Sequence, residues 1–116
     1  MTCLLDLKAR LAAFARARDW EQFHSPKNLA MALVVEAGEL VEQLQWLTEE
    51  QTYTLTAEQR AAVTDEVADV LLYLIRFADR AQIDIEQAAW DKIAKNEAKY
   101  PADQVRGSAR KYTDYP

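Results

Sequence analysis

Three segments of this chain begin with residues that start α-helices, and they leave little room for another kind of fold. The Ser25-Pro26 pair places a good N-cap before a proline, which fits the first position of a helix. Thr56 is followed three residues later by Gln59, which is the pattern of a capping box, and Asp84 and Gln87 repeat this spacing with Asp as the cap. The sequence therefore predicts three helices that each begin with a capped turn.

Composition and apolar spacing extend this prediction to the rest of the chain. Only two of the 116 residues are Gly and three are Pro, which suits long helices with short connections better than a turn-rich β fold. A first helix is predicted from residue 2 to about 18, and the others end near Leu47, near Ala81 and before Pro101. Four helices with short connections predict an all-α, antiparallel four-helix bundle, followed by an irregular tail at about residues 102–116.

The chain is short enough to form one domain over residues 1–116. Its single cysteine, Cys3, rules out an internal disulfide and a cysteine-based metal site and fits a reducing compartment. Charged residues interrupt the leucines of the first fifteen positions, and no apolar run reaches the length of a membrane span. We therefore expect a cytoplasmic protein that does not enter a membrane.

The net charge of −5 argues against binding to a nucleic acid polymer, whose phosphates would repel an acidic protein. A small phosphorylated molecule remains an acceptable ligand if a divalent cation screens the repulsion.

Two of the predicted helices each carry a pair of acidic residues three positions apart. The pairs are Glu36 with Glu39, and Glu66 with Asp69. Residues at i and i+3 lie on one face of a helix, about one turn apart. Two such helices side by side would direct four carboxylates into one space.

Helical spacing places one acid of each pair on the face that should be buried. Glu36 and Glu66 fall inside the apolar stripes of their helices, whereas Glu39 and Asp69 lie at the borders. The apolar positions that define the two stripes are Leu29, Leu33, Leu40, Leu47, Val63, Val70, Leu74 and Phe77. Burying an ionised carboxylate is costly unless it has a partner, so we expect one here.

A hard divalent cation is the simplest partner for four carboxylates. An all-oxygen ligand set suits Mg²⁺, with Mn²⁺ as a substitute, and Mg²⁺ often bridges protein carboxylates to the phosphates of a substrate. One alternative is that these are ordinary acids on helix surfaces that are rotated outward from the predicted orientation. A di-iron centre would require Glu-x-x-His pairs, which the lone histidine, His24, does not supply.

Aromatic residues surround the predicted acid cluster. Tyr73 follows Asp69 by four residues, and Trp46 follows Glu39 by seven, so both could flank a base next to the metal. The loop before the second helix adds Trp20, Phe23 and His24. Each aromatic could instead fill the edge of the core, but their number favours a stacking pocket. In the fourth helix, Lys92, Asn96 and Lys99 share a face that could bind phosphates or simply be solvated.

Together these residues resemble the MazG-like superfamily of all-α nucleoside triphosphate pyrophosphatases. The signature of that family is a Glu-x-x-Glu helix followed by a Glu-x-x-Asp helix, which here reads 36–39 and 66–69. The resemblance is greater to the dCTP pyrophosphatase branch and covers nearly the whole chain. The matching stretches are residues 18–24, 26, 28–29, 39–40, 45–46, 92–96, 100–101, 106–108 and 111–113.

The resemblance implies an enzyme that hydrolyses the bond between the α- and β-phosphates of a nucleotide. It implies that the acids Glu36, Glu39, Glu66 and Asp69 bind magnesium, that Trp20, Phe23, His24, Trp46 and Tyr73 form the nucleoside pocket, and that Lys92 and Asn96 bind phosphates. Members assemble as dimers or tetramers, in which partner chains can help to close each site. One departure is at Leu11, where some eukaryotic relatives carry a histidine that contacts the ligand.

The sequence thus predicts a Mg²⁺-dependent pyrophosphohydrolase that converts a dNTP, dCTP or a 5-modified dCTP, to the monophosphate and pyrophosphate. The predicted assembly is a homodimer or homotetramer. Two other readings stay open. One is the same chemistry on a nucleotide with another base or a damaged base. The other is a non-catalytic helical module that binds a nucleotide or only copies of itself.

Overall fold

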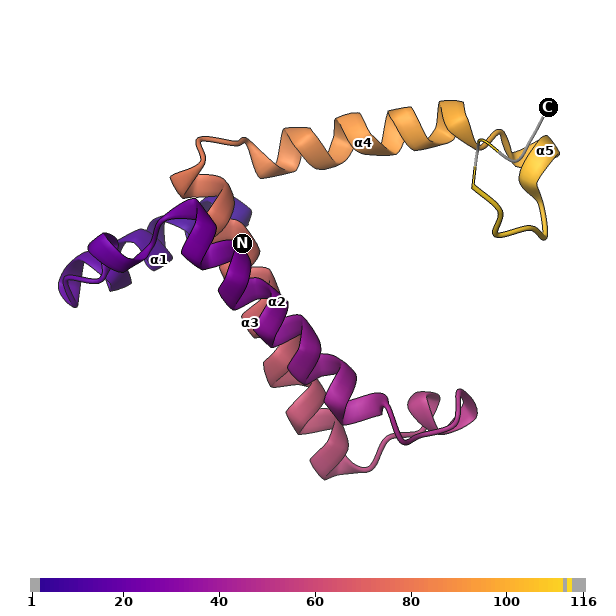
Figure 1. The fold of residues 1–116 in the computed structure, drawn as a ribbon, viewed down its shortest axis with the longest axis horizontal. Helices are drawn as coiled ribbons and strands as arrows, with labels where there is room; N and C mark the ends of the chain where they lie inside the picture. Colours follow the sequence, from indigo (N-terminus) through magenta and orange to yellow (C-terminus); the bar gives the residue numbers. More distant parts are fainter. Residues whose placement is uncertain (1–2, 112, 114–116) are drawn as a thin grey trace. The chain divides into compact units, whose positions relative to one another are not determined.

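The computed structural model of the chain describes residues 3–111 and 113, and within them it contains helices and no strand (Figure 1). This confirms the predicted all-α class. The α-helices are α1 (Leu4–Ala17), α2 (Pro26–Leu44), α3 (Ala57–Arg80), α4 (Ile85–Lys99) and α5 (Ala102–Val105). Short 3-10 helices, η1 (Glu21–Phe23) and η2 (Glu50–Tyr53), lie in the connections that flank α2. No helix in this part of the chain is both long enough and apolar enough to cross a lipid bilayer.

The three predicted caps begin the helices as expected. At the start of α3 the hydroxyl of Thr56 accepts a hydrogen bond from the Gln59 N–H at 3.1 Å, and the Gln59 side chain accepts one from the Thr56 N–H at 2.9 Å. The other two caps each accept a hydrogen bond from a backbone N–H three residues ahead. The Ser25 hydroxyl accepts from the Asn28 N–H at 3.1 Å, and the Asp84 carboxylate accepts from the Gln87 N–H at 3.0 Å. These bonds satisfy N–H groups that have no partner inside the helix.

The described chain divides into two compact units between Ile83 and Asp84. In the first unit α2 and α3 lie side by side and antiparallel, and α1 packs against α3 (Figure 1). The second unit contains α4 and α5. A single functional domain over residues 1–116 stays a prediction.

The core of the first unit lies where α3 meets its two neighbours. Leu29 of α2 and Ile75 of α3 are 2% and 1% exposed. The prediction that Leu74 lies in the core was wrong, because its side chain is 39% exposed. Near its end α3 packs against α1 as well as α2, and the buried positions there are Ile75, Arg76 and Ala78. A helix that contacts two neighbours buries a broader face than a single stripe describes.

Two boundaries differ from the prediction. Helix α2 ends at Leu44 rather than near Leu47, because a new capped turn begins at Thr48. There the Thr48 hydroxyl accepts from the Gln51 N–H at 3.2 Å, and the Gln51 side chain accepts from the Thr48 N–H at 2.9 Å. The tail is not irregular throughout, since α5 forms one short turn after Pro101. Residue 2 of the predicted first helix, and residues 112 and 114–116 of the tail, lie outside the described residues.

Candidate active site

Helices α2 and α3 bring three of the four predicted acids into one cluster. One carboxylate oxygen from each of Glu36, Glu39 and Glu66 lies within 4.8 Å of the other two. All three side chains are half-buried. The Oε2 atoms of Glu36 and Glu66 are buried and have no hydrogen-bond partner. These acids therefore face one another across the helix pair and are not solvated groups on an outer surface.

The cluster has the chemistry of a site for a hard divalent cation. Two oxygens that share one Mg²⁺ are at most about 4.2 Å apart, which is twice the metal–oxygen distance. Small side-chain rotations would bring the three glutamates within that limit. The two buried oxygens without partners are the groups that such an ion would satisfy.

Proximity raises the pKa of all three carboxyls above the ordinary value. The largest cause for Glu36 is a hydrogen bond to Glu66, which forms when one of the two is protonated, followed by burial. A similar bond to Glu36, together with the charge of Glu36, raises the pKa of Glu39. For Glu66 the bond with Glu36 lowers the pKa, but burial and the charges of Glu39 and Asp69 outweigh it. The fold therefore disfavours ionisation of all three carboxyls together, and a bound cation would oppose that effect.

We expect Glu36→Gln to raise the melting temperature of the metal-free protein at pH 8 by a few degrees. A carboxyl whose pKa is raised by folding binds its proton more tightly in the folded chain, so stability falls as the pH rises from the ordinary pKa of 4.5 through the folded value. The difference between variant and wild type should vanish near pH 4, where the group is protonated in both states. Thermal melts across this range in a chelating buffer measure it. The matched control is Glu42→Gln, at an exposed position of α2, and an equal gain there would contradict the explanation.

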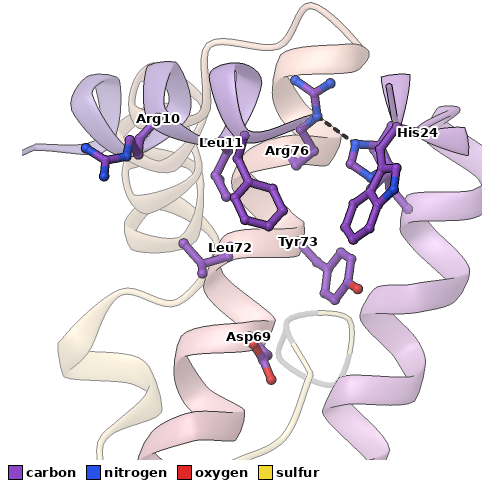
Figure 2. Close-up of a pocket in the computed structure, with 10 residues that line it drawn as sticks. Arg10, Leu11, His24, Asp69, Leu72, Tyr73 and Arg76 are labelled. Carbon is purple, nitrogen blue, oxygen red and sulfur yellow. Dashed lines mark hydrogen bonds between the residues drawn. The ribbon is translucent and has the colours of Figure 1, made fainter. Parts of the chain in front are cut away.

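Asp69, the fourth predicted acid, links the carboxylate cluster to a cavity. Its charge contributes to the raised pKa of Glu36 and of Glu66. Its side chain also lines a cavity of about 390 Å³ next to the cluster (Figure 2). A volume of that size is typical of a site for a small molecule. The lining residues are Arg10, Leu11, Phe14, Trp20, His24, Leu29, Asp69, Leu72, Tyr73 and Arg76.

One side of α3 forms the floor of the cavity. Asp69, Tyr73 and Arg76 follow one another at spacings of four and three residues, so they lie along a single face of the helix (Figure 2). The lining residues outside α3 come from α1, from the segment between α1 and α2, and from Leu29 of α2. The cavity thus has a charged end at Asp69 and an aromatic wall at Tyr73 and Trp20.

A helix C-terminal motif places Trp20 in this wall. Asp19 adopts a left-handed conformation with φ of 54°. The N–H of Trp20 donates to the Ala15 carbonyl at 2.9 Å, and that of Asp19 donates to the Arg16 carbonyl at 3.1 Å. This is the Schellman arrangement, which ends α1 and turns the chain back. The indole then packs edge-to-face against Phe14, with ring centroids 5.7 Å apart.

His24 is held by α3 through both its ring and its backbone. The Arg76 Nε donates to its Nδ1 at 3.1 Å (Figure 2), and the Arg80 Nε donates to its carbonyl oxygen at 3.0 Å. Burial, followed by the charges of Arg76 and Arg80, lowers the pKa of His24, and the charge of Glu21 opposes them. His24 is therefore a neutral imidazole at pH 7.

The cavity does not include every residue that the sequence singled out. Phe23 is 59% exposed in η1, and Trp46 is 87% exposed just beyond the end of α2, far along that helix from Leu29. Lys92 and Asn96 lie one turn apart on α4, in the second unit, and both are exposed. Their predicted roles stay predictions.

Sequence reasoning missed Phe14 and Arg76 among the cavity residues. Arg76 lies seven residues after Asp69 and three after Tyr73, so helical spacing alone would have placed it on the same face. Phe14 belongs to the apolar stripe of α1 and carries no sequence signal that separates a cavity wall from a core. Leu11, which the sequence analysis singled out as a departure from the family, does line the cavity.

Comparison with known proteins places the chain in a family. The model of the MazG-like family matches residues 31–115. The dCTP pyrophosphatase 1 of Mus musculus is 47% identical over 97% of this chain, and that of Bos taurus is 45% identical over the same share. The chain spans 68% of the length of each. The crystal structure of a pyrophosphatase from Archaeoglobus fulgidus has a TM-score of 0.81 and 35% identity, covering 87% of this chain and 94% of that one.

The family match covers well over half of the chain, and it includes both acid pairs and the whole of α3. The relatives also confirm the resemblance to dCTP pyrophosphatases on which the sequence reading relied. This chain belongs to the MazG-like family.

Proposed function

We propose that the protein hydrolyses a deoxynucleoside triphosphate between its α- and β-phosphates and releases the monophosphate and pyrophosphate. It is an enzyme of the nucleotide diphosphatase class, as its similarity to dCTP pyrophosphatase 1 from several mammals and to an archaeal pyrophosphatase indicates. The proposal extends to the metal, the substrate and the role of each residue.

The position of Asp69 is the observation that carries this proposal. Its carboxylate interacts with the glutamate cluster and also lines the cavity. A ligand that fills the cavity therefore reaches the carboxylates at one end. A nucleotide has this shape, with a flat apolar base at one end and phosphates at the other.

The cavity wall supports a stacked base. Trp20 and Tyr73 offer aromatic faces, and stacking on such faces contributes about 1–3 kcal/mol per base in nucleic-acid complexes. The wall is largely apolar, and its residues with polar side-chain ends are Arg10, Trp20, His24, Asp69, Tyr73 and Arg76. We assign dCTP or a 5-modified dCTP as the preferred substrate. Leu11 adds an apolar side chain to this wall, and a panel of nucleotides would show which base it favours.

Glu36, Glu39, Glu66 and Asp69 would hold Mg²⁺, or Mn²⁺ in its place. When bound, the ion screens the triphosphate, stabilises the charge that develops on the leaving pyrophosphate and lowers the pKa of water. The carboxylates contribute the ligand oxygens and, through their mutual repulsion, a strong tendency to bind a cation.

Direct attack by water is the mechanism that suits the described wall of the cavity, because it contains no serine or cysteine to act as a nucleophile. Water adds to phosphorus, the bond to the bridging oxygen breaks, and pyrophosphate leaves while a proton is released. A carboxylate with a raised pKa is a suitable acceptor for that proton. Glu36 and Glu39 are the candidates, since both lie on α2 and place a carboxylate oxygen within 4.8 Å of one on Glu66.

The proposal also assigns roles to residues outside the cavity. Lys92 and Asn96 bind the phosphates within one domain of residues 1–116. The protein acts as a homodimer or homotetramer, which is supported by apolar side chains exposed on α2, such as Val34 at 70% and Val41 at 58%. Exposed Trp46 would then act from a neighbouring copy.

The nucleotide substrate and the single cysteine support a cytoplasmic location, and the net charge of −5 disfavours nucleic acid polymers.

The test is a product analysis with each common dNTP and 5-methyl-dCTP. We expect the monophosphate and pyrophosphate in equal amounts, with the largest kcat/KM for a cytosine nucleotide. Release of orthophosphate would reassign the reaction to a phosphatase. A faster reaction with a nucleotide that carries another base would support the same reaction with a different preferred substrate. No turnover of any nucleotide would favour a non-catalytic binding module.

A further inference from the structure

Arg76 is a buried cation in a wall that is otherwise largely apolar. Its side chain is 5% exposed, near the end of α3. The Nε donates to the ring of His24 at 3.1 Å, and the Nη1 donates to the Asp79 carboxylate at 3.2 Å. The third nitrogen, Nη2, is buried with no hydrogen-bond partner among the described residues.

The contact with His24 fixes the protonation of the imidazole. A guanidinium donates hydrogen bonds and accepts none, so the Nδ1 of His24 must be the acceptor and carries no proton. A neutral imidazole with a bare Nδ1 carries its proton on Nε2. The two nitrogens lie on opposite edges of the ring, and the Nε2–H therefore points away from Arg76. His24 and Tyr73 line the same cavity (Figure 2).

A purely structural role explains this arrangement poorly. The Asp79 carboxylate also lies 3.8 Å from the Lys8 ammonium, so Arg76 is not its only cation. A buried arginine with an unpaired nitrogen is costly, and buried ion pairs often add little to stability compared with apolar residues of similar volume. The part of the arrangement that an apolar residue could not supply is the bond to the His24 ring.

We propose that Arg76 is a positioning residue that holds His24 as an Nε2–H donor in the wall of the cavity, where this N–H meets an acceptor atom on the edge of the nucleobase. The identity of the acceptor rests on the proposed function, whereas the held donor can be measured without any nucleotide. Around His24 the charged groups are Arg76 and Arg80 on α3 and Glu21 on η1, with Asp79 behind Arg76. Of these groups, only Arg76 forms a hydrogen bond with the imidazole ring of His24.

The single histidine makes the test direct, because its ring nitrogens give the only imidazole ¹⁵N signals of the chain. In the nucleotide-free wild type at pH 8, we expect the spectrum of one tautomer, with a bare Nδ1 and a protonated Nε2. In Arg76→Met the signals should move toward the averaged positions of a tautomer mixture. The matched control is Arg80→Met, which removes the donor to the carbonyl of His24 but not the donor to its ring, and it should keep the single-tautomer spectrum.

Kinetics supply the second measurement. Losing one hydrogen bond to the base should raise KM for the preferred dNTP about tenfold in Arg76→Met. Because the base is remote from the reacting phosphates, kcat should stay within about threefold of the wild type. Arg76→Lys keeps a charge and a donor in nearly the same volume, and we expect a smaller rise in KM. Circular dichroism of each variant identifies any that fails to fold.

The outcomes separate the two proposals. A wild-type spectrum with a protonated Nδ1 would overturn the role of Arg76, and this measurement needs no variant to fold. An unchanged tautomer and an unchanged KM in folded Arg76→Met would also overturn it. If the wild type turns over no nucleotide, the proposed function fails, but the spectra still decide whether Arg76 holds His24.

Discussion

Glu66→Gln is expected to lower turnover by about a thousandfold or more while the helices stay folded, because the amide cannot replace a charged oxygen in the acid cluster. A carboxylate oxygen of Glu66 lies within 4.8 Å of one on each of Glu36 and Glu39, so the substitution removes one of three clustered carboxylates. Steady-state pyrophosphate release at saturating Mg²⁺ measures the loss. Circular dichroism and thermal melting in a chelating buffer should show an intact protein that is at least as stable as the wild type.

The matched control is Asp65→Asn. Asp65 is the neighbour of Glu66 on α3, carries the same charge and is exposed to solvent. It should retain nearly full activity, since it lies off the face that meets α2. Full activity in Glu66→Gln, or an equal loss in Asp65→Asn, would remove the acid cluster from the active site.

Removal of divalent cations is expected to stop the reaction completely and to lower the melting temperature of the wild type. The free cluster keeps three carboxyls with raised pKa values in contact, and a bound cation would relieve that repulsion. A ligand that binds only the folded state adds stability, about 2.7 kcal/mol when its concentration is a hundred times its Kd. Activity and thermal melts should be followed at pH 8 with EDTA and then during titration with Mg²⁺.

The variant Glu66→Gln supplies the control for this experiment. Its melting temperature should respond much less to Mg²⁺, because it has lost a ligand and part of the repulsion that the ion relieves. Turnover that persists in EDTA would show that the carboxylates do not act through a metal. A thermal shift of equal size in the variant would place the ion elsewhere on the chain.

The helical fold was predictable because its signals are local. The caps at Ser25, Thr56 and Asp84 depend on side chains three residues from their partners, and the structure contains all three. The acid cluster was predictable for a related reason. Once the spacing of Glu36 and Glu66 had placed them in apolar stripes, only the pairing of two neighbouring helices was needed to bring them together.

The cavity was less predictable because its contacts join distant parts of the chain. The bond between Arg76 and His24 spans 52 residues, and no spacing rule connects them. The 39% exposure of Leu74 is likewise not given by the apolar spacing of α3 itself. Sequence periods describe the face of one helix, whereas a cavity wall depends on which helices meet and where a loop returns.

The linear order of the site along α3 has a consequence for how such enzymes diversify. Glu66, Asp69, Tyr73 and Arg76 occupy about 15 Å of helix, at 1.5 Å per residue. Glu66 and Asp69 occupy the middle of the helix, and the cavity residues Tyr73 and Arg76 lie toward its end. If the proposed function holds, we expect mutations in the last turns of α3, or in the loop that carries Trp20 and His24, to alter which base is accepted while the carboxylates stay unchanged. Selection for a new nucleotide would act on one end of a single helix, and the hydrolytic machinery would be inherited intact.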